Sequence, residues 1–588
     1  MTKLKGIGVS PGIAFGPVYR LPDLRQFVPD TPLRSEEVQP EIGRWQKALA
    51  ETESELRKIR AQIARSSDAR NAEIFNVELL FLQDKDLQEQ ILNNIRKGIN
   101  AARAVQLVVH QYLDPLVKVK NSYLKERRFD LEDVGKRLVR NLLGLKGFLS
   151  EIKEKKVVLV AYNLSPSETA TLDREMVSAF ATDVGGPTSH TAIMARALEI
   201  PAVVGLKNLT GLVNSGETII VDGQEGVVIV APDEITVKIY SRRQNDFQRV
   251  HRSLAPMKNV VARTTDRHRI KIGANIELPN EVNSVLAHGA DEIGLFRTEF
   301  LYLNRDDPPS EEEQFKVYRH VVEKVHPLPV TIRTLDLGGD KFSSALDIPE
   351  EVNPFLGWRA IRFCLSRPKI FRAQLRAILR ASAYGKVRLM YPLISDVEEI
   401  IAANGLLQEA KKQLSNEGKR FDREIPVGAM IEVPSAALTA RTIARHVDFF
   451  SIGTNDLVQY SMAVDRTNER TAYLYNPAHP AILCLIKEVV SAARAAGIWV
   501  GICGEMAADP AMAFLLMGMG ITELSMAPLA IPEVKQMAVS VSFKEASEFA
   551  RKILRLDSTV EIADLLKKQY SRIRVANNPT KTLGVEDD

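Results

Sequence analysis

The sequence has few of the features that mark extracellular, membrane or nucleic-acid-binding proteins. Its 588 residues contain three cysteines, Cys364, Cys484 and Cys503, which are too few and too scattered for a disulfide framework or a zinc site. It has no apolar run of about 18 residues, so we expect no membrane insertion. The net charge of +4 is small and the basic residues are matched by acids, so we expect no nucleic-acid partner. Together these absences predict a soluble, cytoplasmic protein.

The spacing of the apolar residues changes along the sequence and divides the chain into regions. At roughly 150 residues per domain, a chain of this length predicts three or four domains. From about Ser35 to Gly144, apolar residues recur at three- and four-residue steps, which predicts a helical bundle of two hairpins. From Lys155 to about Val230, and in the first twenty residues, short β-branched runs between turn residues predict a small α/β domain. The helical bundle is therefore expected to be an insertion near the start of this domain.

From Arg269 to about Tyr570 the chain alternates between strand and helix patterns. The strand candidates, eight in number, begin with RIKIGANI and end with TELSM. This rhythm predicts a (β/α)8 TIM barrel, with an open doubly wound sheet as the alternative. We assign residues 1–20 and 146–230 to the α/β domain, 21–145 to the inserted helical domain, 231–262 to a linker helix, 263–575 to the barrel and 576–588 to a disordered tail.

One stretch of the helical region is strongly acidic. Residues 71–90 contain five acids against Lys85 alone. This stretch is either a solvated helix face or a docking face for a basic partner. The helical region has no glycine-rich phosphate loop and no metal-ligand cluster, so we expect it to bind and not to catalyse. The five acids are Glu73, Glu78, Asp84, Asp86 and Glu89.

Polar side chains follow the predicted barrel strands at their carboxyl ends, where the chemistry of such barrels takes place. Three arginines and one asparagine there suit a ligand with several negative charges, because guanidinium groups match phosphate and carboxylate oxygens. Glu432 and Asp456 are the oxygen ligands that Mg²⁺ prefers. Cys503 is either a proton donor or a small buried apolar residue. The other four residues are Arg297, Arg333, Asn455 and Arg466.

His190 lies in the stretch DVGGPTSHTAIMAR, at the start of a helical pattern. On local evidence it could be a catalytic base, a metal ligand, a phosphate carrier or a surface residue. The barrel residues fit phosphoenolpyruvate, which has a phosphate, a carboxylate and a carbon that takes a proton once the phosphoryl group has left. The barrel offers no obvious phosphoryl acceptor, and a helix N-terminus stabilises added negative charge. We therefore expect His190 to carry the phosphoryl group.

Long motifs run in one order along nearly the whole chain. They include GGPTSHTAIMARALEIPAVVG, GADEIGLFRTEFLY, RTLDLGGDK, NPFLGWRAIR, IGTNDLVQYSMAVDRTNER and GICGEMAADP. They closely resemble enzyme I of the bacterial phosphoenolpyruvate:sugar phosphotransferase system. The resemblance implies a swivelling α/β phosphohistidine domain, an inserted helical domain that docks the carrier protein HPr, and a barrel that binds phosphoenolpyruvate, releases pyruvate and forms a homodimer.

The same motifs imply roles for individual residues. His190 resembles the phosphorylated histidine, through Nε2, and Cys503 resembles the proton donor. The resemblance implies that Mg²⁺ is held by Glu432 and Asp456. The residues that resemble substrate contacts are Arg297, Arg333, Arg359, Asn455, Asp456 and Arg466.

Two stretches depart from the family pattern. Pro187 stands where the family often has arginine, and the docking region reads IFNVELLFLQDKDL, where relatives more often have a histidine and more acids. One alternative is an enzyme like phosphoenolpyruvate synthase or pyruvate phosphate dikinase, but those need an ATP-binding domain, and the helical segment has no phosphate loop. The other is a non-catalytic regulatory scaffold, which would be expected to have lost Glu432, Asp456 or Cys503.

Overall fold

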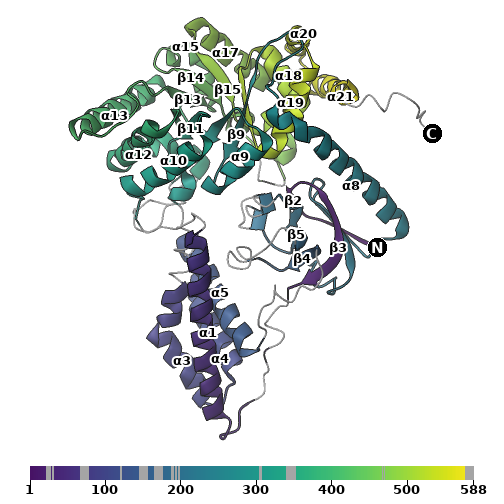
Figure 1. Cartoon of the computed structure of the whole chain (residues 1–588), viewed down its shortest axis with the longest axis vertical. Helices are drawn as coiled ribbons and strands as arrows, with labels where there is room; N and C mark the ends of the chain where they lie inside the picture. Colours follow the sequence, from purple (N-terminus) through teal and green to yellow (C-terminus); the bar gives the residue numbers. More distant parts are fainter. Residues whose placement is uncertain are drawn as a thin grey trace. The chain divides into compact units, whose positions relative to one another are not determined.

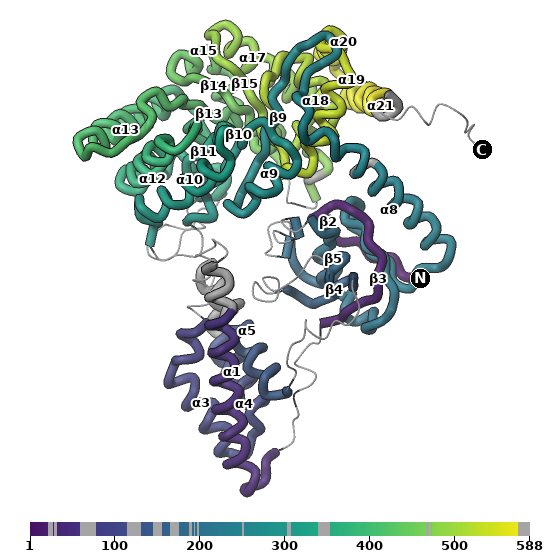
Figure 2. Tube along the Cα trace, in the orientation of Figure 1, coloured from purple at the N-terminus to yellow at the C-terminus, as the bar shows by residue number. Residues whose placement is uncertain are grey.

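The computed structural model divides the chain into two compact units, Met1–His251 and Arg252–Asp588 (Figures 1 and 2). No helix in the part of the chain that it describes is long and apolar enough to cross a membrane. The predicted tail, residues 576–588, lies outside the described residues apart from Ala576. The structure describes residues 1–21, 28, 32–65, 78–118, 122–144, 156–164, 176–186, 191–192, 195–196, 199–302, 307–338, 353–465, 468 and 470–576.

The α/β part of the first unit is built on one sheet with the strand order β1-β8-β7-β3-β4-β5-β6-β2. β1 and β2 are separated by Gly6 alone, yet they lie at opposite ends of this order, so the sheet curls round on itself. A β-carbon on Gly8 would lie 2.1 Å from the carbonyl oxygen of Gly223, so this close approach requires glycine. The strands are β1 (Thr2–Lys5), β2 (Ile7–Ser10), β3 (Ile13–Arg20), β4 (Val157–Ala161), β5 (Val177–Thr182), β6 (Ala202–Val204), β7 (Thr218–Asp222) and β8 (Val227–Val230).

Helix α8 (Glu234–Leu254) follows the last strand of this sheet and packs back against it. The amide of Gln244 donates to the carbonyl oxygen of Ile13 at 2.8 Å. Arg243 forms an ion pair of 3.3 Å with the buried Asp222. Tyr240 belongs to the apolar cluster that lies on Ile13 and its neighbours in the sheet. The segment expected to link the domains is thus anchored to the sheet by the first part of its helix.

The helical part of the first unit consists of amphipathic helices around an apolar core. The core includes Trp45, Leu56, Ile91, Val105 and Leu138, each almost fully buried. The apolar spacing seen in the sequence therefore corresponds to real packing. The helices with described bounds are α1 (Val38–Arg65), α3 (Lys85–Arg96), α4 (Ala101–Lys118) and α5 (Ser122–Leu142).

The acidic stretch of this bundle does not form one solvent-facing surface. Glu78 is buried. Asp84 caps the N-terminus of α3, where its side chain accepts from the backbone N–H groups of Asp86 and Leu87. Glu89 pairs with Arg96 at 2.9 Å on the same helix. The interpretation of all five acids as one face is therefore wrong for Glu78; Glu73 lies outside the described residues.

The second unit is a closed barrel of parallel strands, as predicted. β16 pairs in parallel with β9, with Leu524 opposite Ile272, and this pairing closes the barrel and rules out the open sheet. The predicted multidomain α/β fold class, with its TIM barrel, is confirmed. The strands are β9 (Lys271–Ile276), β10 (Glu292–Phe296), β11 (Val330–Arg333), β12 (Val387–Tyr391), β13 (Val427–Ile431), β14 (Phe449–Ile452), β15 (Trp499–Ile502) and β16 (Glu523–Met526).

Helices surround the barrel strands (Figure 1), and local signals set their ends. Ser310 and Glu313 form a capping box at the start of α10, and Gly497, with φ of 73°, ends α17 in a left-handed conformation. The helices are α9 (Val282–His288), α10 (Glu311–Val325), α11 (Ala360–Ser366), α12 (Pro368–Ala381), α13 (Val397–Asn416), α14 (Pro434–Leu438), α15 (Ala440–Ile443), α16 (Thr454–Met462), α17 (Pro480–Ala496), α18 (Pro510–Met519), α19 (Ile531–Ser540), α20 (Phe543–Ile553) and α21 (Thr559–Ala576).

Candidate active site at the carboxyl end of the barrel

The predicted site residues of the barrel lie at the carboxyl ends of its strands. Arg297 directly follows β10, Arg333 is the last residue of β11, Glu432 follows β13 and Cys503 follows β15. Asp456 lies in the first turn of α16, just after β14. Because parallel strands of a barrel end at one rim, these side chains come from five strands to the same mouth.

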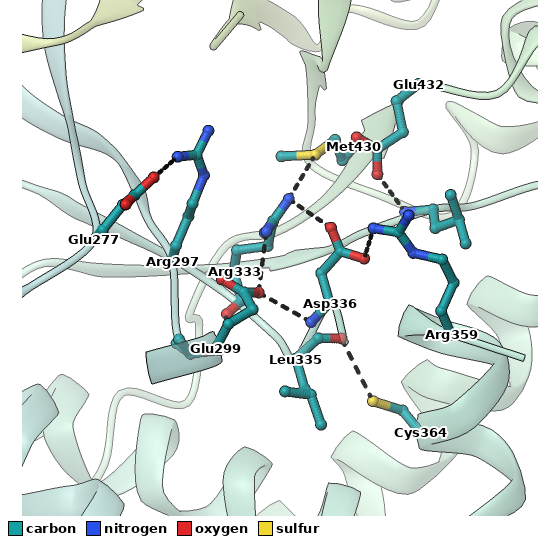
Figure 3. Close-up of polar contacts among 12 residues, drawn as sticks. Glu277, Arg297, Glu299, Arg333, Leu335, Asp336, Arg359, Cys364, Met430 and Glu432 are labelled. Atoms are coloured by element: carbon teal, nitrogen blue, oxygen red, sulfur yellow. Dashed lines mark hydrogen bonds and ion pairs between the residues drawn. The ribbon is translucent and has the colours of Figure 1, made fainter. Parts of the chain in front are cut away.

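An acidic side chain that the sequence analysis did not single out, Asp336, lies between two of the predicted arginines (Figure 3). Its Oδ2 pairs with Nη1 of Arg333 at 2.9 Å, and its Oδ1 accepts from Nη2 of Arg359 at 2.8 Å. Asp336 thus fixes the distance between the two guanidinium groups. It follows Arg333 by three residues within the motif RTLDLGGDK, which was the available signal.

Glu299 contacts both Arg333 and the backbone of Asp336 (Figure 3). Its Oε1 accepts from Nη2 of Arg333 at 3.0 Å and from the backbone N–H of Asp336 at 3.0 Å. Burial opposes the charge on Arg333, but Glu299 and Asp336 outweigh it and raise the pKa of the guanidinium above its ordinary value. Arg333 is therefore a permanent buried cation with a fixed orientation.

Both arginines keep a donor available for a further group. The Nε atoms of Arg333 and Arg359 are buried and have no hydrogen-bond partner within the described residues. A buried donor without an acceptor costs about 1–3 kcal/mol, which a ligand with anionic oxygens would relieve. The arrangement thus suits an anion that approaches both guanidinium groups.

Three carboxylates converge beside these arginines. Asp336, Glu432 and Asp456 each place an oxygen within 4.8 Å of the others. Burial, and then the negative charges of Asp456 and Asp336, raise the pKa of Glu432 to about 8. Gly453 leaves the room that Glu432 needs, because a β-carbon there would lie 2.5 Å from Oε2 of Glu432. Such a cluster of oxygen donors fits a divalent cation.

Two predicted residues lie at the rim but make their contacts elsewhere. Arg297 forms an ion pair with Glu277, which follows β9 (Figure 3). The side chain of Asn455 accepts from the backbone N–H of Glu505 at 3.0 Å. Neither contact reaches the three-carboxylate cluster, so both side chains sit at the edge of the site.

Cys503 has features of both interpretations left open by the sequence. Only 5% of it is exposed, and it packs with Met390, Met430 and Phe449 inside the barrel. Its thiol lies 3.7 Å from the carbonyl oxygen of Ile452, and burial raises its pKa to about 11. The thiol therefore keeps its proton at neutral pH.

Three residues of the sequence analysis cannot be placed. His190 and Pro187 lie outside the described residues, as does Arg466. Their roles therefore remain predictions.

Comparisons with known proteins agree with this layout. Three family descriptions match: PEP-utilising enzyme, N-terminal, at residues 5–127; its mobile domain at 153–226; and its PEP-binding domain at 251–543. A phosphoenolpyruvate-protein phosphotransferase from Staphylococcus carnosus is 42% identical over 96% of this chain and 99% of its own. One from Bacillus subtilis is 43% identical over 97% of this chain and 100% of its own. A solution structure of an enzyme I protein, with a TM-score of 0.34, is 43% identical over 42% of this chain and 99% of its own.

Proposed function

The chain belongs to the phosphoenolpyruvate-protein phosphotransferase (enzyme I) family, and on that premise we propose that His190 is its phosphoryl carrier. The chain is a transferase that moves the phosphoryl group of phosphoenolpyruvate to itself and then to HPr, and releases pyruvate. The observation that carries the assignment to the barrel mouth is the pair of buried arginines with available Nε donors beside three converging carboxylates.

The arginines are proposed to bind the anionic groups of phosphoenolpyruvate. Arg333 and Arg359 are both held by Asp336, so an anionic ligand that reaches them meets two fixed positive charges. Guanidinium groups bind phosphate and carboxylate in a defined geometry, which aligns the phosphoryl group for transfer. Arg297, Asn455 and Arg466 are proposed to complete the substrate contacts from the edge of the site.

Glu432 and Asp456 are proposed as the Mg²⁺ ligands, with Asp336 as a third carboxylate of the same cluster. The raised pKa of Glu432, caused by burial and then by the charges of Asp456 and Asp336, supports this choice, because a bound cation favours the ionised carboxylate. When bound, Mg²⁺ supplies positive charge that stabilises the oxygens of a transferring phosphoryl group.

Cys503 is proposed to protonate the enolate that remains after phosphoryl loss. A proton donor must hold its proton before the reaction, and a thiol with a pKa of about 11 does so at neutral pH. Its position directly after β15 puts it at the same rim as Arg333 and Glu432.

The phosphoryl acceptor is proposed to come from the α/β domain. No histidine directly follows a barrel strand in the described part of the chain, which leaves the barrel without an acceptor of its own. His190 then has to visit both the barrel and the docked carrier, so a large hinge motion about the linker belongs to the proposal. A scaffold without catalysis does not need the buried charges of the barrel mouth.

A homodimer through the barrel is proposed from exposed apolar side chains in short helical segments that follow barrel strands. Phe355, Leu356, Leu438 and Tyr473 are exposed and follow strands β11, β13 and β14. The O–H of Tyr460 donates to the carbonyl oxygen of Phe355 at 2.7 Å, which joins two of these regions. Sedimentation of a Leu356→Glu/Tyr473→Glu variant should give monomers, whereas an unchanged dimer would contradict this interface.

Transfer to the carrier is tested by mixing the protein with labelled phosphoenolpyruvate, Mg²⁺ and purified HPr proteins. The proposal predicts label on HPr that requires both the protein and phosphoenolpyruvate. Formation of phosphoenolpyruvate from pyruvate and ATP, with no label on any HPr, would instead identify an enzyme of the synthase or dikinase type.

A further inference from the structure

The side chain of Gln374, on α12, is a buried amide that contacts the segments following β10 and β11. It is fully buried and uses both ends of its amide. Its Oε1 accepts from the backbone N–H of Leu335 at 2.9 Å. Its Nε2 donates to Oγ1 of Thr298 at 3.1 Å and to the phenol oxygen of Tyr318 at 3.2 Å. One side chain thus contacts two loops at the barrel rim.

Both loop contacts lie next to residues of the candidate site. Leu335 precedes Asp336, the acid between Arg333 and Arg359, and Thr298 follows Arg297. Oγ1 of Thr298 also donates to the carbonyl oxygen of Arg333 at 2.9 Å. Gln374 therefore ties the loop after β10 to the loop after β11.

The orientation of this amide is fixed by the groups around it. The O–H of Tyr318 donates to Oε1 of Gln314 at 3.1 Å, so its oxygen is available to accept from Gln374. Oγ1 of Thr298 gives its own hydrogen to Arg333 and likewise accepts. A reversed amide would face Leu335 N–H with another donor. Each donated hydrogen in this network thus has one acceptor, so all of its hydrogen bonds have a defined donor and acceptor.

We propose that Gln374 is a positioning residue for the binding of phosphoenolpyruvate. It holds the backbone at Leu335 and, through Thr298, at Arg333, and so fixes the positions of Arg333 and Arg359. This inference rests on the proposed function of the barrel mouth. Asp336 contacts both Arg333 and Arg359, so a shift of the Leu335–Asp336 backbone moves both guanidinium groups together. Misplacement of such groups by about 1 Å can cost on the order of 100-fold in rate.

The chain offers a matched control in Gln314. It is equally buried and belongs to the same network, where its Oε1 accepts from Tyr302 and Tyr318. Its Nε2 donates to the carbonyl oxygen of Pro309 at 3.0 Å, so Gln314 contacts the connection after β10 at Tyr302 and Pro309 and not at Thr298. Gln314→Met therefore removes comparable buried hydrogen bonds but leaves the link from Thr298 through Gln374 to Leu335 in place.

The test compares Gln374→Met, Gln314→Met and Thr298→Val by melting temperature and by kcat/KM for phosphoenolpyruvate in the full-length protein. We expect a drop of about tenfold or more in kcat/KM for Gln374→Met, and less than twofold for Gln314→Met at a similar loss of melting temperature. Because Thr298→Val breaks the same link, its effect should be less than additive with that of Gln374→Met.

Equal loss of kcat/KM in the two glutamine variants would overturn the positioning role. If Gln374→Met fails to fold, Thr298→Val decides alone, since an unchanged kcat/KM in that near-isosteric variant contradicts the link. A wild-type protein without activity on phosphoenolpyruvate would instead refute the proposed function. These results are distinguishable from one another.

Discussion

The two ends of the barrel both bury charged side chains, but they differ in which buried groups lack a hydrogen-bond partner among the described residues. At the amino end, Arg388 bonds Glu292 at 3.0 Å and Glu523 at 3.1 Å, and its guanidinium lies 4.6 Å from the ring centre of Trp499. Burial and the neighbouring Glu292 raise the pKa of Glu523 well above its ordinary value. Arg388 thus has both acids as partners, and the buried atom without a hydrogen-bond partner in this cluster is an acceptor, Oε1 of Glu292.

At the carboxyl end the charges converge without cancelling. Arg333 and Arg359 each keep a buried Nε donor with no acceptor among the described residues. Three carboxylates lie together there, and burial, followed by the charges of the other two, raises the pKa of Glu432. Residue type alone therefore does not identify a binding site. Arginine lies beside acidic residues at both ends, but at the carboxyl end buried arginine donors remain without an acceptor among the described residues.

The largest expected effect is that of Glu432→Gln compared with Glu523→Gln. Both replace a buried, protonation-prone glutamate with a near-isosteric amide. Loss of the proposed metal ligand should lower phosphorylation by phosphoenolpyruvate by about 1,000-fold or more, whereas Glu523→Gln should stay within about threefold. Equal activity of the two variants in a single-turnover assay would remove the distinction between the two ends.

The substitution Glu432→Gln should not destabilise the metal-free protein. The folded-state pKa of Glu432, about 8, lies above its ordinary value of 4.5, so the folded state binds the extra proton. Its contribution to stability is therefore present below pH 4.5 and is lost as pH rises to about 8. Glu432→Gln removes this loss, so its melting temperature at pH 8 should equal or exceed that of the wild type.

Cys503→Ala is expected to slow pyruvate formation by about 100-fold or more, because it removes the proposed proton donor. Binding of phosphoenolpyruvate, measured by calorimetry, should change by less than about threefold, since the thiol is not among the charged contacts. A large loss of binding with normal turnover of bound substrate would favour the purely apolar role for Cys503.

Arg388→Met tests the amino end by stability. Removal of Arg388 leaves Glu292 buried without its closest cation, and breaking such a pair costs about 3–5 kcal/mol. Urea unfolding should show a loss of this order, while KM for phosphoenolpyruvate in the remaining folded protein stays the same. A changed KM with unchanged stability would mean that the amino end takes part in binding.

The smallest expected effect is the pH dependence of Mg²⁺ affinity. Because the pKa of Glu432 is about 8, metal binding has to displace its proton at lower pH. Affinity should therefore rise by up to about tenfold per pH unit from pH 6 to 8, and then level off. The slope should vanish in Glu432→Gln when titrations of wild type and variant are compared.

The barrel was predictable because its strand pattern repeats and because carboxyl strand ends meet at one rim, which brought Arg333, Glu432 and Cys503 together in advance. Asp336 and Gln374 could not be predicted in their roles, because those roles depend on which loops touch. The prediction that the acidic stretch forms one exposed face was wrong for Glu78 for a related reason. Glu78 is buried by packing, which its charge alone does not reveal.

In the proposed reaction, the phosphoryl group of phosphoenolpyruvate passes from this barrel to His190. The most direct measurement is labelling of wild-type protein and of His190→Ala with radioactive phosphoenolpyruvate and Mg²⁺, followed by peptide mapping of the label. We expect one labelled peptide, which contains His190, and no label in the variant. Undiminished labelling of His190→Ala, or label on a different residue of the wild type, would contradict it.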